Sequence, residues 1–310
     1  MPEYVIHIDT VAFAHNDGAM GEVFMECTPV ADGASIRQGD IFIFRDSPTG
    51  DDIWKKAGVI VTADCDIAND KHAGILSYVP IFPLRDYLAW RVMPKIADDR
   101  RKRNLRQISE LIGRLERDLD IRPGLSGAAI EVLATVAGGL KDLQSHLGSV
   151  TQKDSDALAA MIEEVSVCDR VRTSSAYAEQ FAMLATIYTS AKKKSAGEVL
   201  LSEIRARLKN LPGDVFFISA LSQEHTGGYI AYLRLIRETH LHQISTSYYY
   251  KDGRSVVANR ASRLRAPYVY RLTQQMADVF TSIGLPEEYE AARDCIFDSR
   301  LAPEPALETT

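Results

Sequence analysis

Two aspartates flank a cysteine directly after an apolar segment, in the run Val59-Ile60-Val61-Thr62-Ala63-Asp64-Cys65-Asp66. If the segment is a strand, alternation places Asp64 and Asp66 on one face and Cys65 on the other. Two carboxylates at a strand end can bind a divalent cation, or one can act as acid and the other as base. Aspartates at such a place also hydrogen-bond turns, so the sequence leaves both interpretations open.

His240 and His242 are a second candidate pair of metal ligands, because residues two apart share one face of a strand. Together with Asp64 and Asp66 they would supply a mixed set of nitrogen and oxygen ligands. Surface or structural histidines are the alternative. Cys65 is either a nucleophile activated by a histidine or a small buried side chain, and the two flanking carboxylates disfavour its thiolate form.

The most basic part of the sequence is 251–271, which carries six basic residues against one acid. Arginine binds phosphate through charge-assisted hydrogen bonds, and tyrosine rings stack on nucleic-acid bases. The residues expected to bind nucleic acid are Arg254, Arg260, Arg263 and Arg265, with Tyr249 and Tyr250 just before the basic run. The final 26 residues carry seven acids against two bases, so a charge match within the chain or with another protein is the alternative.

The elements that must position these residues change along the chain from β to helical and back to β. Short stretches rich in Ile, Val, Phe and Tyr predict strands up to residue 83 and again from residue 213. Apolar residues at helical spacing predict helices between these two regions, and a further amphipathic helix opens at Pro267. Because either β part alone is short for a closed sheet, we predict that both belong to one barrel.

The predicted fold class is α+β, with a small SH3-like β-barrel core, a helical insertion and a C-terminal helix. The barrel comprises 1–83 and 213–266, the helical subdomain 84–212, the closing helix 267–300 and the tail 301–310. Three serial lobes are the alternative arrangement.

Two segments of the first β region form a pattern. Gly39–Arg45 has the sequence GDIFIFR, and after a loop Lys55–Thr62 has the sequence KKAGVIVT. Over residues 39–66 the chain resembles the opening of the PemK/MazF-like small-barrel proteins, in which a basic residue and a Ser or Thr serve RNA cleavage. The resemblance implies a PemK-like barrel and catalytic roles for Lys56 and Thr62. The Asp-Cys-Asp run and the helical segment are departures from that family.

Composition limits the function classes. The chain has 310 residues and a net charge of −6, which argues against a bulk nucleic-acid coat protein. Its four cysteines include no CxxC pair, so neither a zinc module nor a disulfide framework is indicated. The sequence shows no signal-peptide pattern at its start and no run of about 18 apolar residues, so we expect a cytoplasmic protein without a membrane partner.

Two functions fit these features. The first is a nucleic-acid-binding protein of a bacterial toxin or antiviral-defence type, with RNA or single-stranded DNA as its partner and nuclease activity left open. A nuclease would use Asp64 and Asp66 beside Lys56 and Thr62, with a divalent cation as the candidate cofactor. The alternative is a non-catalytic protein–protein interaction module in a multi-component or homo-oligomeric assembly. Steep salt dependence of binding separates the two.

Overall fold

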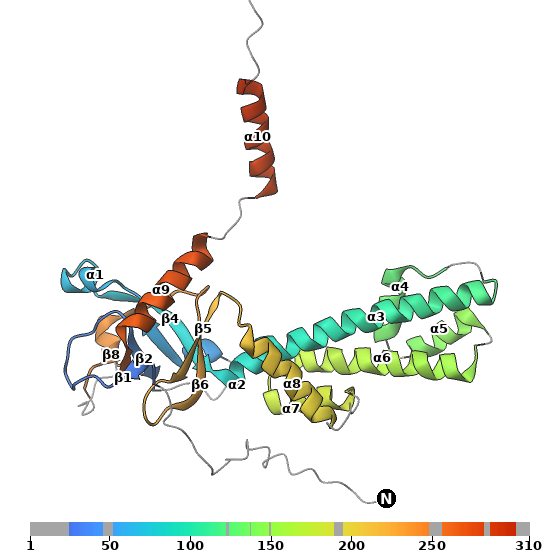
Figure 1. The fold of residues 1–310 in the computed structure, drawn as a ribbon, viewed down its shortest axis with the longest axis horizontal. Helices are drawn as coiled ribbons and strands as arrows, with labels where there is room; N and C mark the ends of the chain where they lie inside the picture. Colours follow the sequence, from blue (N-terminus) through green and yellow to red (C-terminus); the bar gives the residue numbers. More distant parts are fainter. Residues whose placement is uncertain are drawn as a thin grey trace, which may run out of the picture.

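A computed structural model describes residues 25–45, 52–121, 124–136, 138–148, 150–188, 195–247, 256–281 and 286–301 of the chain. The fold combines a barrel-like sheet with a long group of helices that extends from it (Figure 1). In the described part of the chain, no helix is both long enough and apolar enough to span a bilayer.

Nine strands in the described part of the chain form a single sheet. The predicted β regions on both sides of the helices contribute to it. Many of these strands are rich in branched and aromatic residues, which pack well on a pleated surface. The strands are β1 (Cys27–Thr28), β2 (Asp40–Phe44), β3 (Ala57–Ile60), β4 (Ile75–Pro83), β5 (Val215–Ala220), β6 (Thr226–Tyr232), β7 (Arg237–His240), β8 (Ile244–Ser245) and β9 (Ala258–Leu264).

The strand order is β1-β9-β2-β3-β4-β6-β5, with β7 beside β4 and β8 beside β9. Neighbours pair antiparallel except β8 and β9, which are parallel. The two ends of this order approach each other, because the Glu26 carboxylate accepts hydrogen bonds from the Ser219 backbone N–H (3.0 Å) and hydroxyl (2.8 Å). Glu26 precedes β1, and Ser219 lies in β5. The sheet is therefore a nearly closed antiparallel barrel, which confirms the α+β class and the barrel-like core.

Apolar side chains of the strands and of helix α9 (Ala266–Thr281) form one core of the barrel. Ile41, Val59 and Val79 are almost completely buried, and Leu272 of α9 packs against them. Full burial of a side chain of this size stabilises the fold by about 1.5–3 kcal/mol. The α9 helix thus covers part of the sheet, as Figure 1 shows.

Seven α-helices and one π-helical turn lie in sequence between β4 and β5 in the described residues. Helices α3 and α6 lie side by side along most of this extension, with α4 and α5 packed near its end (Figure 1). Ile108 and Ile112 of α3 pack with Leu143, Leu158 and Val165 to form a separate core. The bounds are α2 (Leu84–Tyr87), the π turn η3 (Leu88–Val92), α3 (Met93–Asp118), α4 (Gly127–Thr135), α5 (Gly139–Leu147), α6 (Gln152–Thr173), α7 (Tyr177–Thr186) and α8 (Ala196–Lys209).

Two segments differ from the sequence expectation. The aspartates expected at a strand end lie in a short helix, α1 (Asp64–Ala68), where acidic side chains in the first turn interact favourably with the helix dipole. The expected closing helix is two helices, α9 and α10 (Glu287–Leu301). Part of the basic run forms β9, within the 213–266 region that the sequence assigned to the barrel. The remaining short elements are the 3₁₀ turns η2 (Ile53–Lys55) and η4 (Leu241–Gln243).

Candidate functional site

Lys56 and Thr62 lie at the two ends of strand β3. The strand runs from Ala57 to Ile60, so Lys56 precedes it and Thr62 follows it. Six residues of extended chain span roughly 15–20 Å. The structure therefore places the two residues that were expected to act together in two different surroundings.

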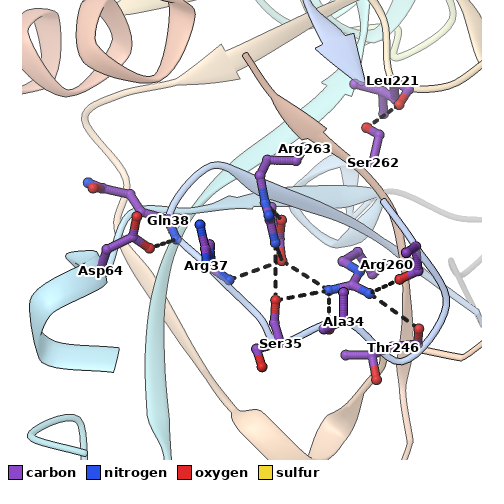
Figure 2. Close-up of polar contacts among 12 residues, drawn as sticks. Ala34, Ser35, Arg37, Gln38, Asp64, Leu221, Thr246, Arg260, Ser262 and Arg263 are labelled. Carbon is purple, nitrogen blue, oxygen red and sulfur yellow. Dashed lines mark hydrogen bonds and ion pairs between the residues drawn. The ribbon is translucent and has the colours of Figure 1, made fainter. Parts of the chain in front are cut away.

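At the Thr62 end of β3, the polar side chains hold backbone segments together. Thr62 Oγ1 accepts a hydrogen bond from the Ser77 N–H at 2.7 Å. Asp64 Oδ1 accepts one from the Gln38 N–H at 2.8 Å (Figure 2). Residues two apart in a helix point about 200° apart, so α1 directs Asp64 and Asp66 to different sides. The same-face arrangement expected from a strand is thus wrong for these two aspartates.

Asp66 borders a shallow hollow of about 390 Å³ that also contains Lys71, His72 and Glu238. The His72 ring accepts a hydrogen bond from the Gly74 N–H (2.9 Å) through Nδ1, so this nitrogen is occupied in the turn. His240 and His242 stack on each other with ring centroids 5.2 Å apart. Among the residues that the structure describes, no three His, Cys, Asp or Glu side chains are grouped to hold a metal ion. The predicted set of Asp64, Asp66, His240 and His242 is not brought together.

Arg260 and Arg263 lie in a buried network around Asp40, part of which Figure 2 shows. Asp40 is 1% exposed and the Arg260 side chain 3%. Arg263 donates to both carboxylate oxygens of Asp40. Arg260 lies 3.4 Å from the same carboxylate and donates to the carbonyls of Ala31, Ala34, Ser35 and Thr246. Because these guanidinium groups hold the 31–40 loop against β9, they have a structural role, and their contact with phosphate stays a prediction.

Arg265 is also engaged within the protein. It donates to the Met25 carbonyl, and its guanidinium carbon lies 5.5 Å from the ring centroid of Tyr268. The other residues expected to bind nucleic acid, Arg254, Tyr249 and Tyr250, lie outside the described residues. The described arginines of the basic run therefore make mainly internal contacts.

The Lys56 end of β3 borders a hollow of about 470 Å³ where the barrel meets the helices. Trp54 and Trp90, the two tryptophans of the chain, both line it. Asp86 from α2 and Arg172 from the end of α6 add a carboxylate and a second cation. These five side chains, Trp54, Lys56, Asp86, Trp90 and Arg172, define what is called here the tryptophan pocket.

Edge-to-face contacts hold the two indole rings in place. The centroids of Trp54 and Trp90 are 5.0 Å apart at an interplanar angle of 81°. Phe82 of β4 packs edge-on against Trp54 at 5.3 Å, and Tyr232 of β6 packs against Trp90 at 5.2 Å. Each such pair contributes about 0.5–1.5 kcal/mol beyond its buried area. Trp90 nevertheless stays 38% exposed, so the pocket presents a fixed indole surface to solvent.

A π-helical turn carries Trp90. In this turn the Met93 N–H donates to the Leu88 carbonyl, five residues back. Pro94 has no N–H, and in a regular helix its ring would clash with the carbonyl four residues earlier, that of Trp90. The wider turn accommodates the proline. Single π turns are frequent at functional sites, and this one lies at the edge of the pocket.

Lys56 and Asp86 are the charges of the pocket that are left for a ligand. Among the described residues, no hydrogen bond or ion pair joins either side chain to another group. Burial raises the pKa of the Asp86 carboxyl, and the nearby Lys56 ammonium lowers it in part. Arg172 lies 3.3 Å from the Asp169 carboxylate. The pocket thus combines an aromatic surface with two cations and one unpaired carboxylate.

Gln180 connects the two walls of the pocket. Its side chain is fully buried, and its Nε2 donates to the carbonyl of Ala89 (3.0 Å), the residue before Trp90. The same amide donates to Val171 (3.2 Å) and Ser174 (2.7 Å) at the end of α6. One amide therefore fixes the π turn relative to the helix that carries Arg172.

The sequence interpretation missed Trp54, Asp86, Trp90 and Arg172. One signal was available: the chain has only two tryptophans, and each is followed directly by a basic residue, Lys55 or Arg91. An aromatic ring next to a cation suits nucleic-acid binding. That the two tryptophans meet depends on how β4 and the π turn pack, which the spacing alone does not show.

No family model, curated protein or solved structure matches the chain. Function therefore has to be inferred from the geometry of the chain itself. An exposed indole beside two cations suits a ligand that has both an aromatic ring and an anionic group. A nucleotide has both.

Proposed function

We propose that the chain binds single-stranded nucleic acid, RNA or DNA, in the tryptophan pocket. The observation that carries the proposal is that the exposed part of Trp90 and the unpaired ammonium of Lys56 border the same hollow of about 470 Å³. Stacking of a base on an indole contributes about 1–3 kcal/mol. Lys56 and Arg172 attract the phosphates on either side of that base.

A single strand suits this pocket better than a duplex. Bases in a duplex are stacked on one another, whereas an unpaired base can leave the stack and lie on an aromatic side chain. Hollows of about 300–1,000 Å³ hold small ligands. The volume of the tryptophan pocket, about 470 Å³, falls in this range.

The charges of the chain predict weak, salt-sensitive binding. The net charge of −6 repels nucleic acid at a distance, so affinity depends on local contacts. Each phosphate neutralised on a single strand contributes about −0.7 to the slope of log K against log salt. Two contacts, from Lys56 and Arg172, give a slope of roughly −1.4.

Fluorescence anisotropy with labelled 12-nucleotide RNA, 12-nucleotide DNA and a DNA duplex tests the proposal. Both single strands should bind more tightly than the duplex. Trp90→Ala should weaken single-strand binding at least about fivefold, which corresponds to about 1 kcal/mol. The control Tyr270→Ala removes a ring that is 69% exposed on α9, outside the pocket, and should bind as wild type does. Equal binding by Trp90→Ala and wild type overturns the proposal.

The finer predictions from the sequence are kept as proposals. A denaturing gel of the same oligonucleotides, with Mg²⁺, Mn²⁺ or chelator, measures nuclease activity. The toxin- or defence-type role and the PemK/MazF-like relationship stay predictions.

We further propose that α2–α8 are a subdomain inserted into a PemK-like barrel. In support, β4 and β5, the strands directly before and after these helices in the sequence, both pair with β6. The chain thus leaves the sheet after β4 and returns to the same part of the sheet at β5.

One feature favours the alternative of a protein–protein interaction module. Helix α10 extends away from the barrel (Figure 1), and Tyr289, Ile296 and Phe297 on it are 55%, 60% and 54% exposed. Sedimentation velocity over a range of concentrations, with wild type and Ile296→Asp, tests the homo-oligomeric form of this alternative. Self-association that Ile296→Asp abolishes supports it, and a wild-type monomer at every concentration contradicts it.

A further inference from the structure

Asp86 has hydrogen-bonding capacity that the described part of the protein does not use. It lies in α2, four residues before Trp90, and both side chains line the tryptophan pocket. The carboxylate is half-buried, and no donor among the described residues reaches it. A carboxylate that is withdrawn from water without a donor lowers stability. A ligand that supplies N–H donors would satisfy it.

The other charges of the pocket restrict that ligand. A guanidinium or ammonium compound would suit Asp86 and the indoles, but Lys56 and Arg172 repel a second cation. The same two residues attract a phosphate. The ligand is therefore planar and anionic and has N–H donors on its ring, which describes a nucleotide whose base edge faces Asp86.

The four bases differ in the donors that they offer to a carboxylate. A carboxylate presents two acceptor oxygens side by side. The Watson–Crick edge of guanine has two adjacent donors, N1–H and the 2-amino group. Adenine and cytosine place an acceptor nitrogen beside their amino group, and uracil has one N–H between two carbonyls. Guanine alone makes two parallel hydrogen bonds to a carboxylate without setting an acceptor against it.

We infer that the tryptophan pocket selects guanine, with the ring on Trp90, the N1 and N2 donors on Asp86, and the phosphates on either side of the base at Lys56 and Arg172. This inference rests on the proposed nucleic-acid binding and adds the identity of the bound base. Asp86 is the specificity-determining residue, whereas Trp90 and Lys56 contribute affinity for any nucleotide.

Intrinsic fluorescence gives a direct measurement, because both tryptophans of the chain line the pocket. Titrations with GMP, AMP, CMP and UMP compare the bases, and IMP, which lacks the 2-amino group, isolates one of the two hydrogen bonds. A bidentate contact discriminates between bases by roughly 5- to 150-fold. GMP should bind more tightly than AMP, CMP and UMP by a factor in this range, with IMP between GMP and the others.

Asp86→Asn exchanges one acceptor for a donor and so should change the preferred base. GMP should bind the variant more weakly, and xanthosine monophosphate, whose 2-carbonyl is an acceptor, should bind it more tightly than it binds wild type. Tighter binding of one nucleotide by the variant shows a change of specificity, because a misfolded protein would bind every nucleotide more weakly. Asp156→Asn changes an aspartate near the start of α6 that accepts a hydrogen bond from Gln152, outside the pocket, and should leave the order of affinities unchanged.

The outcomes separate the two proposals when the 12-nucleotide strands are measured alongside. Equal affinity for all the nucleotides, with the strands still bound, overturns guanine selection and leaves the proposed function standing. No binding of any nucleotide or strand overturns both. Selection of GMP that survives Asp86→Asn overturns the role of Asp86.

Discussion

Lys56 and Thr62 lie at opposite ends of strand β3, and their surroundings differ in chemistry. Lys56 borders the tryptophan pocket, and its ammonium forms no hydrogen bond or close ion pair with a described side chain. Thr62 is fixed by a hydrogen bond from the Ser77 N–H (2.7 Å). One short strand thus separates a candidate for ligand binding from a structural turn.

Lys56→Met and Thr62→Val should therefore separate binding from stability. Lys56→Met removes one phosphate contact, so the salt slope of single-strand binding should become shallower by about 0.7. Its loss of stability at neutral pH should be limited to the lost attraction between the ammonium and the Asp86 carboxylate. Thr62→Val removes the acceptor for Ser77 and should lower the free energy of unfolding by about 1 kcal/mol with binding unchanged. Anisotropy at several salt concentrations and urea unfolding measure the two effects. A loss of binding in a fully stable Thr62→Val would place Thr62 in the binding site.

Arg260→Ala should destabilise the fold strongly. The change leaves Asp40, which is 1% exposed, with one cation fewer, and it removes the donor to four backbone carbonyls. Breaking a buried ion pair from one side costs about 3–5 kcal/mol. Arg260→Lys keeps the charge but lacks the planar fork of donors, so it should recover only part of the loss. Urea unfolding checks both variants, and wild-type stability combined with weakened nucleic-acid binding would contradict the structural role.

The β–helix–β order could be predicted because apolar periodicity is a local property of the sequence. Strand β9 could not, since the segment Ala258–Leu264 contains Asn, Ser and two arginines instead of branched apolar residues. It is held by partners that are distant in sequence: Ser262 donates to the Leu221 carbonyl, and Arg263 pairs with Asp40. Which charges are neutralised by such partners does not follow from charge counts, so a basic run alone does not distinguish a structural arginine pair from a phosphate-binding surface.

The candidate site was predicted only at Lys56, and there from a resemblance. Trp54 and Trp90 are 36 positions apart by their residue numbers, and β4 and the π turn bring them to 5.0 Å. That contact depends on packing rather than on local spacing. The secondary structure at Asp64 and Asp66 was predicted wrongly for a local reason. Helix α1 has five residues and ends at Ala68, so it is too short for a helical period to be visible in the sequence.

Gln180→Met should weaken both the fold and the pocket. Methionine has a similar length but cannot donate to the carbonyls of Ala89, Val171 and Ser174, which Gln180 joins. Buried carbonyls left without a donor cost about 1–3 kcal/mol, so the urea midpoint should fall. Trp90 should become more accessible to iodide or acrylamide quenching because Ala89 is no longer fixed to the end of α6. Gln180→Glu is measured alongside as a comparison. If Gln180→Met is destabilised but quenching of Trp90 fluorescence is unchanged, Gln180 acts in folding alone.

The last prediction concerns the dependence of stability on pH, which follows from the burial of Asp86. Burial raises the pKa of this carboxyl above its ordinary value, with the Lys56 ammonium opposing part of the effect. The folded protein therefore holds the Asp86 proton more tightly than the unfolded chain does. The contribution of this group to stability is present below the pKa of the unfolded state and is lost as the pH rises through the pKa of the folded state.

Asp86→Asn should accordingly melt at a higher temperature than wild type at pH 7, and the difference should shrink as the pH falls toward 4. Lys56→Met serves as the matched variant, because loss of the ammonium raises the pKa of Asp86 further. This variant should be as stable as wild type at low pH and less stable than wild type at pH 7. Thermal melts of the three proteins between pH 4 and pH 8 measure this. If Asp86→Asn is less stable than wild type at pH 7, the carboxylate makes a stabilising contact within the fold. A residue that lowers stability at neutral pH, and whose replacement alters base selection, is instead retained for its ligand.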